Sequence, residues 1–276
     1  MPEAHLTPIP DRPALELTPS SGRPSTLVLA DLHLGLGSSE GPAAVPPEAL
    51  ARTMALDIVA LARERGAHRL LVVGDVKHPI VGTPRNLRPV VFDVFSTILS
   101  ADVSAEVILG NHDVGLARWL PREVVVHPAR GIVREGIGFF HGHRWPSNAV
   151  LRARRLVVGH LHPGFRFAPT ADAPSAKLRC WVRSQILPKP AVARRRGGRA
   201  PIAAREVIVL PAFNPIAGIE SLNREKPARS RSFLVRRFVA RGRSRAYLLD
   251  GTDVGEILTA TRGRRTGAAA RAAPGR

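Results

Sequence analysis

The 276-residue sequence predicts an α/β protein in which helices flank β-sheets. Over residues 26–113, apolar strand-like runs alternate with amphipathic helical segments. After residue 120, short strand patterns follow one another with turn residues between them. Several apolar runs also end in Asp, Asn or His, as strands do where their carboxyl ends line a ligand crevice.

The first half of the chain reads as strand, helix, strand, helix, strand. The expected strands cover residues 26–31, 68–75 and 105–113. Residues 46–66 predict a helix, because Pro46 and Pro47 precede an apolar face at helical spacing and Gly66 follows it. Residues 86–100 predict a second helix. The alternation indicates a sheet whose strands are joined by crossover helices.

The second half predicts mainly short strands. Their expected ranges are 123–127, 131–143, 155–162, 164–168, 177–182 and 207–213. Only residues 147–155 have a helical pattern there. Residues 245–258 predict a hairpin, because Asp250 and Gly251 lie between two apolar runs.

Composition suggests one domain with extensions. Residues 1–24 are rich in Pro, Ser and Thr and are expected to form an extended arm. Residues 25–258 are expected to form one domain, with a basic Gly-containing loop at 191–206. Residues 259–276 contain five arginines and no acid, which predicts a disordered basic tail.

The formal charge of +19 is concentrated in the second part of the chain. Residues 1–100 hold 9 basic and 10 acidic side chains, whereas residues 101–276 hold 32 and 12. This asymmetry suggests a polyanionic partner, nucleic acid first, although arginine enrichment can also reflect genome composition.

Other features of the composition limit the class of protein. The single cysteine, Cys180, excludes an internal disulfide and a thiolate metal cluster. No apolar stretch reaches the roughly 18–20 residues that span a membrane, and the N-terminus does not resemble a signal peptide. We expect a cytoplasmic protein without a membrane partner.

Five apolar runs finish in oxygen or imidazole donors. The residues at these ends are Asp31 and His33; Asp75; Asn111, His112 and Asp113; His141; and His160 and His162. Each piece alone is common in turns or on surfaces. All of them together, each after a strand, indicate a metal site at one sheet edge.

The order Asp-x-His, Gly-Asp, Gly-Asn-His-Asp, His, Gly-His-x-His resembles the calcineurin-like metallophosphoesterase superfamily over residues 26–163. The segments "GDVKH", "CWV" and "LPAFNPIAGIESLN" are also similar to archaeal SbcD-related and bacterial DNA-ligase-associated phosphoesterases. The resemblance implies a four-layer fold, in which a two-sheet β-sandwich is flanked by helices. It also implies that the protein hydrolyses phosphate esters.

The resemblance also implies a role for each residue. One metal ion would be held by Asp31, His33 and His162, and the other by Asn111, His141 and His160, with Asp75 bridging the two. His112 would be the catalytic imidazole and Asp113 would orient it. Lys77, two residues after Asp75, could contact substrate phosphate or be a solvated turn lysine.

Imidazole and carboxylate donors without thiolate suit Mn, Fe, Zn, Co or Ni, and the resemblance favours two Mn ions. The resulting hypothesis is a phosphodiesterase or nuclease that acts on nucleic acid in DNA repair, with a helicase or ligase as a possible partner. A phosphodiesterase of small cyclic or linear nucleotides is an alternative. A non-catalytic scaffold in a repair complex is a second alternative.

Overall fold

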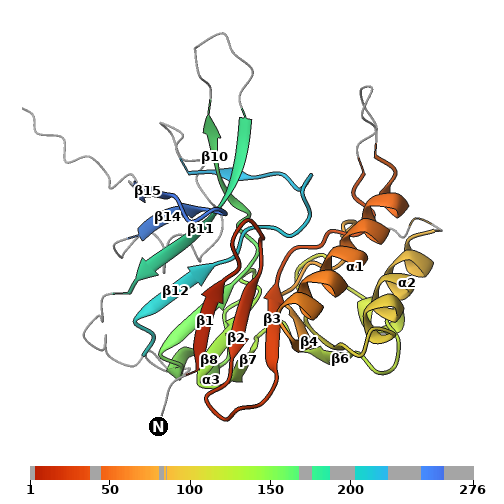
Figure 1. Cartoon of the computed structure of the whole chain (residues 1–276), viewed down its shortest axis with the longest axis horizontal. Coiled ribbons are helices and arrows are strands. Elements are labelled where there is room, and N and C mark those ends of the chain that lie inside the picture. The colour runs from red at the N-terminus through yellow and green to blue at the C-terminus, as the bar shows by residue number, and fades with distance from the viewer. Residues whose placement is uncertain are drawn as a thin grey trace, which may run out of the picture.

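The computed structural model describes residues 4–37, 45–80, 84, 86–167, 176–186, 203–222 and 244–257. These residues form two β-sheets and a layer of two long helices on the outer side of one sheet (Figure 1). Of the predicted basic loop at 191–206, only residues 203–206 are described. The tail predicted at 259–276 lies outside the described residues.

Sheet 1 has six strands in the described part of the chain, and their spatial order follows the sequence. They are β1 (His5–Pro8), β2 (Leu15–Thr18), β3 (Ser25–Leu29), β4 (Ala67–Val72), β5 (Ser104–Ile108) and β6 (Val125–His127). The strands β3 to β6 are parallel, whereas β1 and β2 are antiparallel to their neighbours. The predicted parallel arrangement is confirmed.

The expectation of an extended arm before residue 25 is wrong for residues 4–24. These residues contain β1 and β2, which pair with each other and with β3 in sheet 1. Leu15 and Leu17 alternate with polar residues, and both are fully buried between the sheets. A period of two buries one face of a strand, and this short local pattern outweighs the Pro-, Ser- and Thr-rich composition around it.

Sheet 2 is larger and its strand order departs from the sequence. Its strands are β7 (Ile132–Arg134), β8 (Ile137–Phe140), β9 (Arg155–Val158), β10 (Pro163–Phe167), β11 (Ala176–Gln185), β12 (Glu206–Val209), β13 (Glu220–Ser221), β14 (Ser244–Leu248) and β15 (Asp253–Glu256). The order is β13-β10-β11-β12-β9-β8-β7, and β14 pairs with β11 and β15. The hairpin predicted at 245–258 is confirmed as β14 and β15.

The segment 131–143, expected as one strand candidate, forms the hairpin of β7 and β8. Its turn residues Glu135 and Gly136 have φ angles of 51° and 76°. Two consecutive positive φ angles are typical of a tight two-residue hairpin turn. The turn places the end of β8, and therefore His141, beside the end of β9.

Two long helices cover sheet 1, as predicted. They are α1 (Pro47–Glu64) and α2 (Leu87–Leu99), and the shorter helices are the 3₁₀-helix Leu116–Arg118 and α3 (Asn148–Arg152). Ile58 of α1 and Phe95 of α2 are fully buried against the sheet, and Val150 of α3 packs on sheet 2. Among the described residues, no helix is long and apolar enough to cross a membrane.

The two sheets pack against each other through a shared apolar core that includes Val28, Leu71, Phe139, Val157 and Trp181. This packing confirms the two-sheet sandwich, which the strand pattern alone cannot distinguish from a single sheet. It also brings the carboxyl ends of strands from both sheets to one edge of the molecule.

Candidate metal centre

Three groups of side chains at this edge have potential ligand atoms within 4.8 Å of one another. They are Asp31 with His33 and His162; Asp75 with His141 and His160; and His33 with His78 and His112. The first two groups, called here the first and second triads, coincide with the two predicted metal positions. The third group includes His78, to which the sequence assigned no role.

In the first triad, the imidazoles of His33 and His162 face each other with their Nε2 atoms 3.1 Å apart. His162 Nε2 also lies 3.4 Å from Asp31 Oδ1. The other nitrogen of His162, Nδ1, donates to the carbonyl oxygen of Gly218 at 2.9 Å. A carbonyl partner fixes the tautomer, so the lone pair of Nε2 points toward the neighbouring ligand atoms.

The second triad repeats this arrangement. His141 Nδ1 donates to the carbonyl oxygen of Val73 at 2.9 Å, and its Nε2 lies 3.2 Å from both Asp75 Oδ2 and Asn111 Oδ1. The rings of His141 and His160 lie edge to face with centroids 4.9 Å apart. The four predicted ligands of this half therefore lie together.

One carboxylate oxygen reaches both triads. Asp75 Oδ2 lies 3.2 Å from His141 Nε2 and 3.9 Å from His33 Nε2. A carboxylate placed between two groups of imidazoles is suited to bridge two cations. The geometry agrees with the bridging role that the sequence resemblance implied for Asp75.

The backbone is strained at five of these residues. Asp31, His33, Asp75, His160 and His162 all have φ between 42° and 73°. Non-glycine residues in this left-handed region cost about 1–3 kcal/mol each and persist where the surrounding structure holds them, typically at functional sites. The strain turns each side chain toward the common centre instead of continuing the strand.

Glycines let the strand ends approach closely. A Cβ at Gly110 would lie 2.1 Å from Asp75 Oδ1, and one at Gly74 would lie 2.3 Å from His141 Nδ1. Both contacts are far shorter than real Cβ atoms show. The Gly-Asp and Gly-Asn-His-Asp motifs thus require glycine because no side chain fits beside the central carboxylate.

The electrostatics suit cation binding. Burial opposes ionisation of Asp31 and Asp75, but His162 and His141 respectively outweigh it and lower the pKa of each carboxyl. Burial lowers the pKa of His33 and His160 to about 4. The carboxylates are therefore charged and these two imidazoles are neutral, which is the protonation that metal ligands require. Although burial opposes it, the carboxylates raise the pKa of His141 to about 9 and also raise that of His162, so these two imidazoles would release a proton when a metal ion binds.

This donor set fits two divalent ions. The clustered ligand atoms are imidazole nitrogens and carboxylate or amide oxygens, and the outward-facing nitrogens of His141 and His162 are held by backbone carbonyls. Such second hydrogen bonds usually accompany metal-binding histidines. The chemistry of the donors is compatible with several transition metals.

His112 lies at the edge of the centre. Its Nε2 is 3.8 Å from Asp75 Oδ2, and its backbone N–H donates to Asp75 Oδ1 at 2.9 Å. Its Nδ1 donates to the carbonyl oxygen of His78. His112 therefore presents Nε2 to the centre, as a catalytic imidazole must.

Asp113 acts differently from the expectation that it orients the His112 ring. Its carboxylate accepts hydrogen bonds from the backbone N–H groups of Gly110, Val76 and Lys77 at 2.8–3.2 Å. Burial, together with the charge of Asp75, raises its pKa to about 6. Asp113 ties the turn that carries His112 to the end of β4, while the His78 carbonyl orients the ring.

Lys77 is 2% exposed, although it follows the strand in a turn. Its ammonium donates to the carbonyl oxygen of Pro79 and lies 5.5 Å from the centroid of the Trp119 ring. Burial lowers its pKa. The lysine is not a solvated turn residue, and its contact with substrate stays a prediction.

The structure adds three residues to the site. The ring of His78 lies 5.4 Å from that of His33, and the ring of His143 lies 5.3 Å from that of His141. Asn214 is fully buried, and its amide donates to the carbonyl oxygens of Leu32 and His33. In the sequence, His78 lies in "GDVKH", His143 in "HGH" and Asn214 in "PAFNP". None of these segments by itself specifies which residues these side chains contact.

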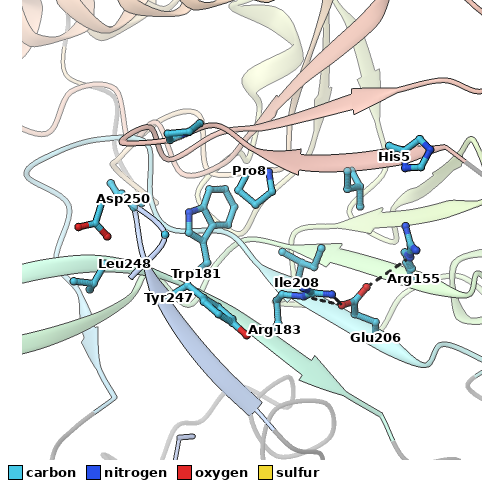
Figure 2. A pocket seen from close by; sticks show the side chains of 14 residues that line it. His5, Pro8, Arg155, Trp181, Arg183, Glu206, Ile208, Tyr247, Leu248 and Asp250 are labelled. Atoms are coloured by element: carbon cyan, nitrogen blue, oxygen red, sulfur yellow. Dashed lines mark hydrogen bonds and ion pairs between the residues drawn. The ribbon is translucent and has the colours of Figure 1, made fainter. Parts of the chain in front are cut away.

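A cavity of about 390 Å³ lies elsewhere, between β1 and the strands β11, β12 and β14 (Figure 2). Pro8, Trp181, Ile208 and Tyr247 form its apolar lining, and Glu206 pairs with Arg183 at one end. It contains none of the clustered histidines and aspartates. The candidate metal centre, a set of converging strand ends, is therefore separate from this cavity.

No protein-family model and no curated protein matches the chain. Among solved structures, it is similar to the crystal structure of the Pseudomonas putida nuclease MPE, with 18% identity, coverage of 89% of this chain and 98% of that chain, and a TM-score of 0.49. It is also similar to YfcE, a phosphoesterase from E. coli, with 14% identity, coverage of 84% and 97%, and a TM-score of 0.35. Similarities this low leave the function to be judged from the site itself.

Proposed function

We propose that this protein is a phosphodiesterase that uses two divalent metal ions and hydrolyses nucleic acid. The observation that carries the proposal is the pair of ligand triads that meet at Asp75. Asp31, His33 and His162 would hold one ion, and Asn111, His141 and His160 the other. Two such ions, when bound, lower the pKa of a water and neutralise phosphate charge.

The charge of the centre favours an anionic substrate. Two dications would bring four positive charges, and Asp31 and Asp75 are the two carboxylates within the triads. The remaining ligands are neutral as imidazoles or an amide. The excess positive charge attracts a phosphate, whereas a site with four or five carboxylates would lose this attraction.

His112 would act on the leaving group. Its Nε2 faces the centre because its Nδ1 is held by the His78 carbonyl. In the imidazolium form, in which both ring nitrogens carry a proton, His112 would donate its Nε2 proton to the oxygen that leaves phosphorus, or stabilise the charge that develops on it. Asp113 keeps the turn in place through three backbone N–H groups.

The charge of the chain supports nucleic acid as the substrate class. The chain has 41 basic and 22 acidic residues, and all of the excess lies after residue 100. Lys and Arg supply sequence-independent affinity for the phosphates of a polynucleotide. A role in DNA repair, Mn as the metal, a cytoplasmic location and a ligase or helicase partner are finer predictions that accompany this proposal.

The test is cleavage of an end-labelled single-stranded oligonucleotide by the purified full chain with Mn²⁺. Wild-type protein should cleave it, whereas Asp75→Asn and wild type with EDTA should not. Zn²⁺, Co²⁺ and Ni²⁺ in place of Mn²⁺ identify the preferred metal. The product ladder separates cleavage from an end from cleavage within the strand.

Two other outcomes would replace this proposal. If small phosphodiesters are hydrolysed but oligonucleotides are not, the protein is a small-molecule phosphodiesterase. If neither is hydrolysed and metal analysis finds both triads empty after incubation with each metal, the scaffold hypothesis takes its place.

A further inference from the structure

The turn that follows β4 carries the group that orients His112. The carbonyl oxygen of His78 accepts the hydrogen bond from His112 Nδ1. Because Nδ1 is engaged in this way, Nε2 faces the metal centre, 3.8 Å from Asp75 Oδ2. The direction of the His78 carbonyl therefore decides how the His112 ring points, and whatever holds residues 77–79 in place acts on His112.

One side of this turn is held by the backbone of the segment after β3. Leu34, which is fully buried, donates its N–H to the carbonyl oxygen of Val76 at 2.7 Å. Its own carbonyl oxygen accepts from the N–H of His78 at 2.9 Å. These bonds end at the N–H of His78, which belongs to the peptide unit before the carbonyl that His112 needs.

Lys77 holds the other side of the turn. Its ammonium reaches past His78 and donates to the carbonyl oxygen of Pro79. The peptide unit that carries the His78 carbonyl lies between the two ends of this link. Pro79 also restricts the backbone of His78 to extended conformations. The lysine side chain therefore closes a ring around the peptide unit on which His112 depends.

Trp119 connects the same ammonium to the turn that carries His112. Lys77 Nζ lies 5.5 Å from the centroid of the Trp119 ring, within the range of a cation–π contact. Leu116 N–H donates to the carbonyl oxygen of Asp113 at 3.1 Å, and Trp119 N–H donates to that of Leu116 at 2.8 Å. The lysine therefore contacts both segments whose relative position sets the hydrogen bond of His112.

The burial of Lys77 fits support better than contact with substrate. Its side chain is 2% exposed, and its ammonium is already engaged by the Pro79 carbonyl and the Trp119 ring. Withdrawing a charged group from water costs free energy that its partners must offset, so lysines that only meet a ligand at the surface stay exposed. Arg118, the residue before Trp119, is exposed in this way.

We propose that Lys77 is a positioning residue that acts through His112. By fixing the turn at Pro79, its ammonium keeps the His78 carbonyl aimed at His112 Nδ1. This inference rests on the proposed function, because Lys77 then serves the imidazole that acts on the leaving group. A direct contact between Lys77 and a substrate phosphate is the competing role, and the experiment separates the two.

The central measurement is a double-mutant cycle for cleavage of a short single-stranded oligonucleotide with Mn²⁺. Lys77→Met removes the ammonium and keeps most of the stem. It should lower kcat about tenfold, with the metal content of wild type and a KM within about twofold of it. In a His112→Ala background, the same substitution should lower kcat by no more than about twofold, because the group through which Lys77 acts is gone.

Two further variants make the result specific. Arg118→Met removes a positive charge beside Trp119 from an exposed position and should leave kcat within about twofold of wild type. Trp119→Leu keeps the lysine but removes the ring under it. This variant should lower kcat less than Lys77→Met does, and again only where His112 is present. Circular dichroism checks the folding of each variant, and Trp119→Leu decides the cycle if Lys77→Met does not fold.

A second readout needs no turnover. Nitrogen–proton correlation spectra of the metal-free protein show which ring nitrogen carries the proton of neutral His112, and His112→Ala assigns the signal. Wild type should hold this proton on Nδ1, which donates to the His78 carbonyl. Lys77→Met should show a mixture of the two tautomers, whereas Arg118→Met should match wild type.

A loss of kcat that is equally large with and without His112 would overturn the proposal. A raised KM with unchanged kcat would also overturn it in favour of substrate contact, and so would wild-type kinetics or an unchanged tautomer in Lys77→Met. If wild type hydrolyses no phosphodiester with any metal, the proposed function fails. The tautomer spectra then still decide whether Lys77 holds the His112 ring.

Discussion

The two sheets contribute different chemistry to the metal centre. Sheet 1 supplies the oxygen ligands, which are Asp31, Asp75 and Asn111, together with His33. Sheet 2 supplies only imidazoles, from His141, His160 and His162. Each triad nevertheless combines at least one carboxylate from sheet 1 with an imidazole from sheet 2.

This division means that neither of the two triads is complete in one sheet, although His33, His78 and His112 of the third group all follow strands of sheet 1. The triads form only when the apolar faces of the two sheets pack, through residues such as Val28, Leu71 and Phe139. Metal binding and closure of the sandwich should therefore stabilise each other. Four predictions examine this comparison, beginning with the largest effect.

Removal of the shared carboxylate should damage both halves. Asp75→Asn is expected to lose both metal ions and to reduce turnover by about 10⁴-fold or more. His162→Ala and His160→Ala should each lose one ion, because each belongs to one triad. The measurement is metal content per chain by mass spectrometry after dialysis, beside the rate of diester hydrolysis. Two retained ions in His162→Ala would contradict the assignment of that triad.

Removal of His112 should separate catalysis from metal binding. His112→Ala is expected to keep both ions and to lose about 10²- to 10³-fold in kcat, because its imidazole faces the centre without completing either triad. Metal content and kcat are measured on the same preparation. A variant with wild-type kcat would exclude His112 from the mechanism.

Close packing at the end of β5 should be sensitive to a single methyl group. Gly110→Ala places a Cβ 2.1 Å from Asp75 Oδ1 and is expected to cost about 3 kcal/mol of unfolding free energy and to weaken metal binding. Gly218→Ala is the matched control, since a Cβ there meets no atom within 4 Å. Urea unfolding of both variants with and without Mn²⁺ measures the free energy of unfolding and the stabilisation by the metal. Equal free energies of unfolding for Gly110→Ala and Gly218→Ala would contradict the packing argument.

The interior of sheet 2 should be chemically unreactive, in contrast to the edge that carries the candidate metal centre. Cys180 is fully buried, and burial raises the pKa of its thiol to about 12. In the folded protein iodoacetamide should leave Cys180 unmodified, whereas in urea it should alkylate the thiol fully. Mass spectrometry of the intact chain reads both states. Equal rates of alkylation in the folded protein and in urea would show that sheet 2 opens readily.

Local patterns were sufficient to find the side chains that converge in the candidate metal centre. The period of the apolar runs placed Asp31, Asp75 and His141 at strand ends, and the motif order brought them into one site. The same reasoning missed the hairpin of β1 and β2, because a composition rich in Pro and Ser outweighed the short alternation at residues 15–18. The family resemblance also implied that Asp113 orients His112, whereas its carboxylate accepts hydrogen bonds from the backbone N–H groups of the turn and of the end of β4.

The sequence by itself therefore determined which residue types stand at the strand ends and which metals and substrates they suit. These are properties of side-chain chemistry and of short-range periodicity. Only the tertiary structure decided that two sheets share the centre, that the His78 carbonyl holds His112, and that Asp113 ties the turn that carries His112 to the end of β4. Those features depend on pairing register and on packing between segments far apart in the chain, which no local pattern encodes.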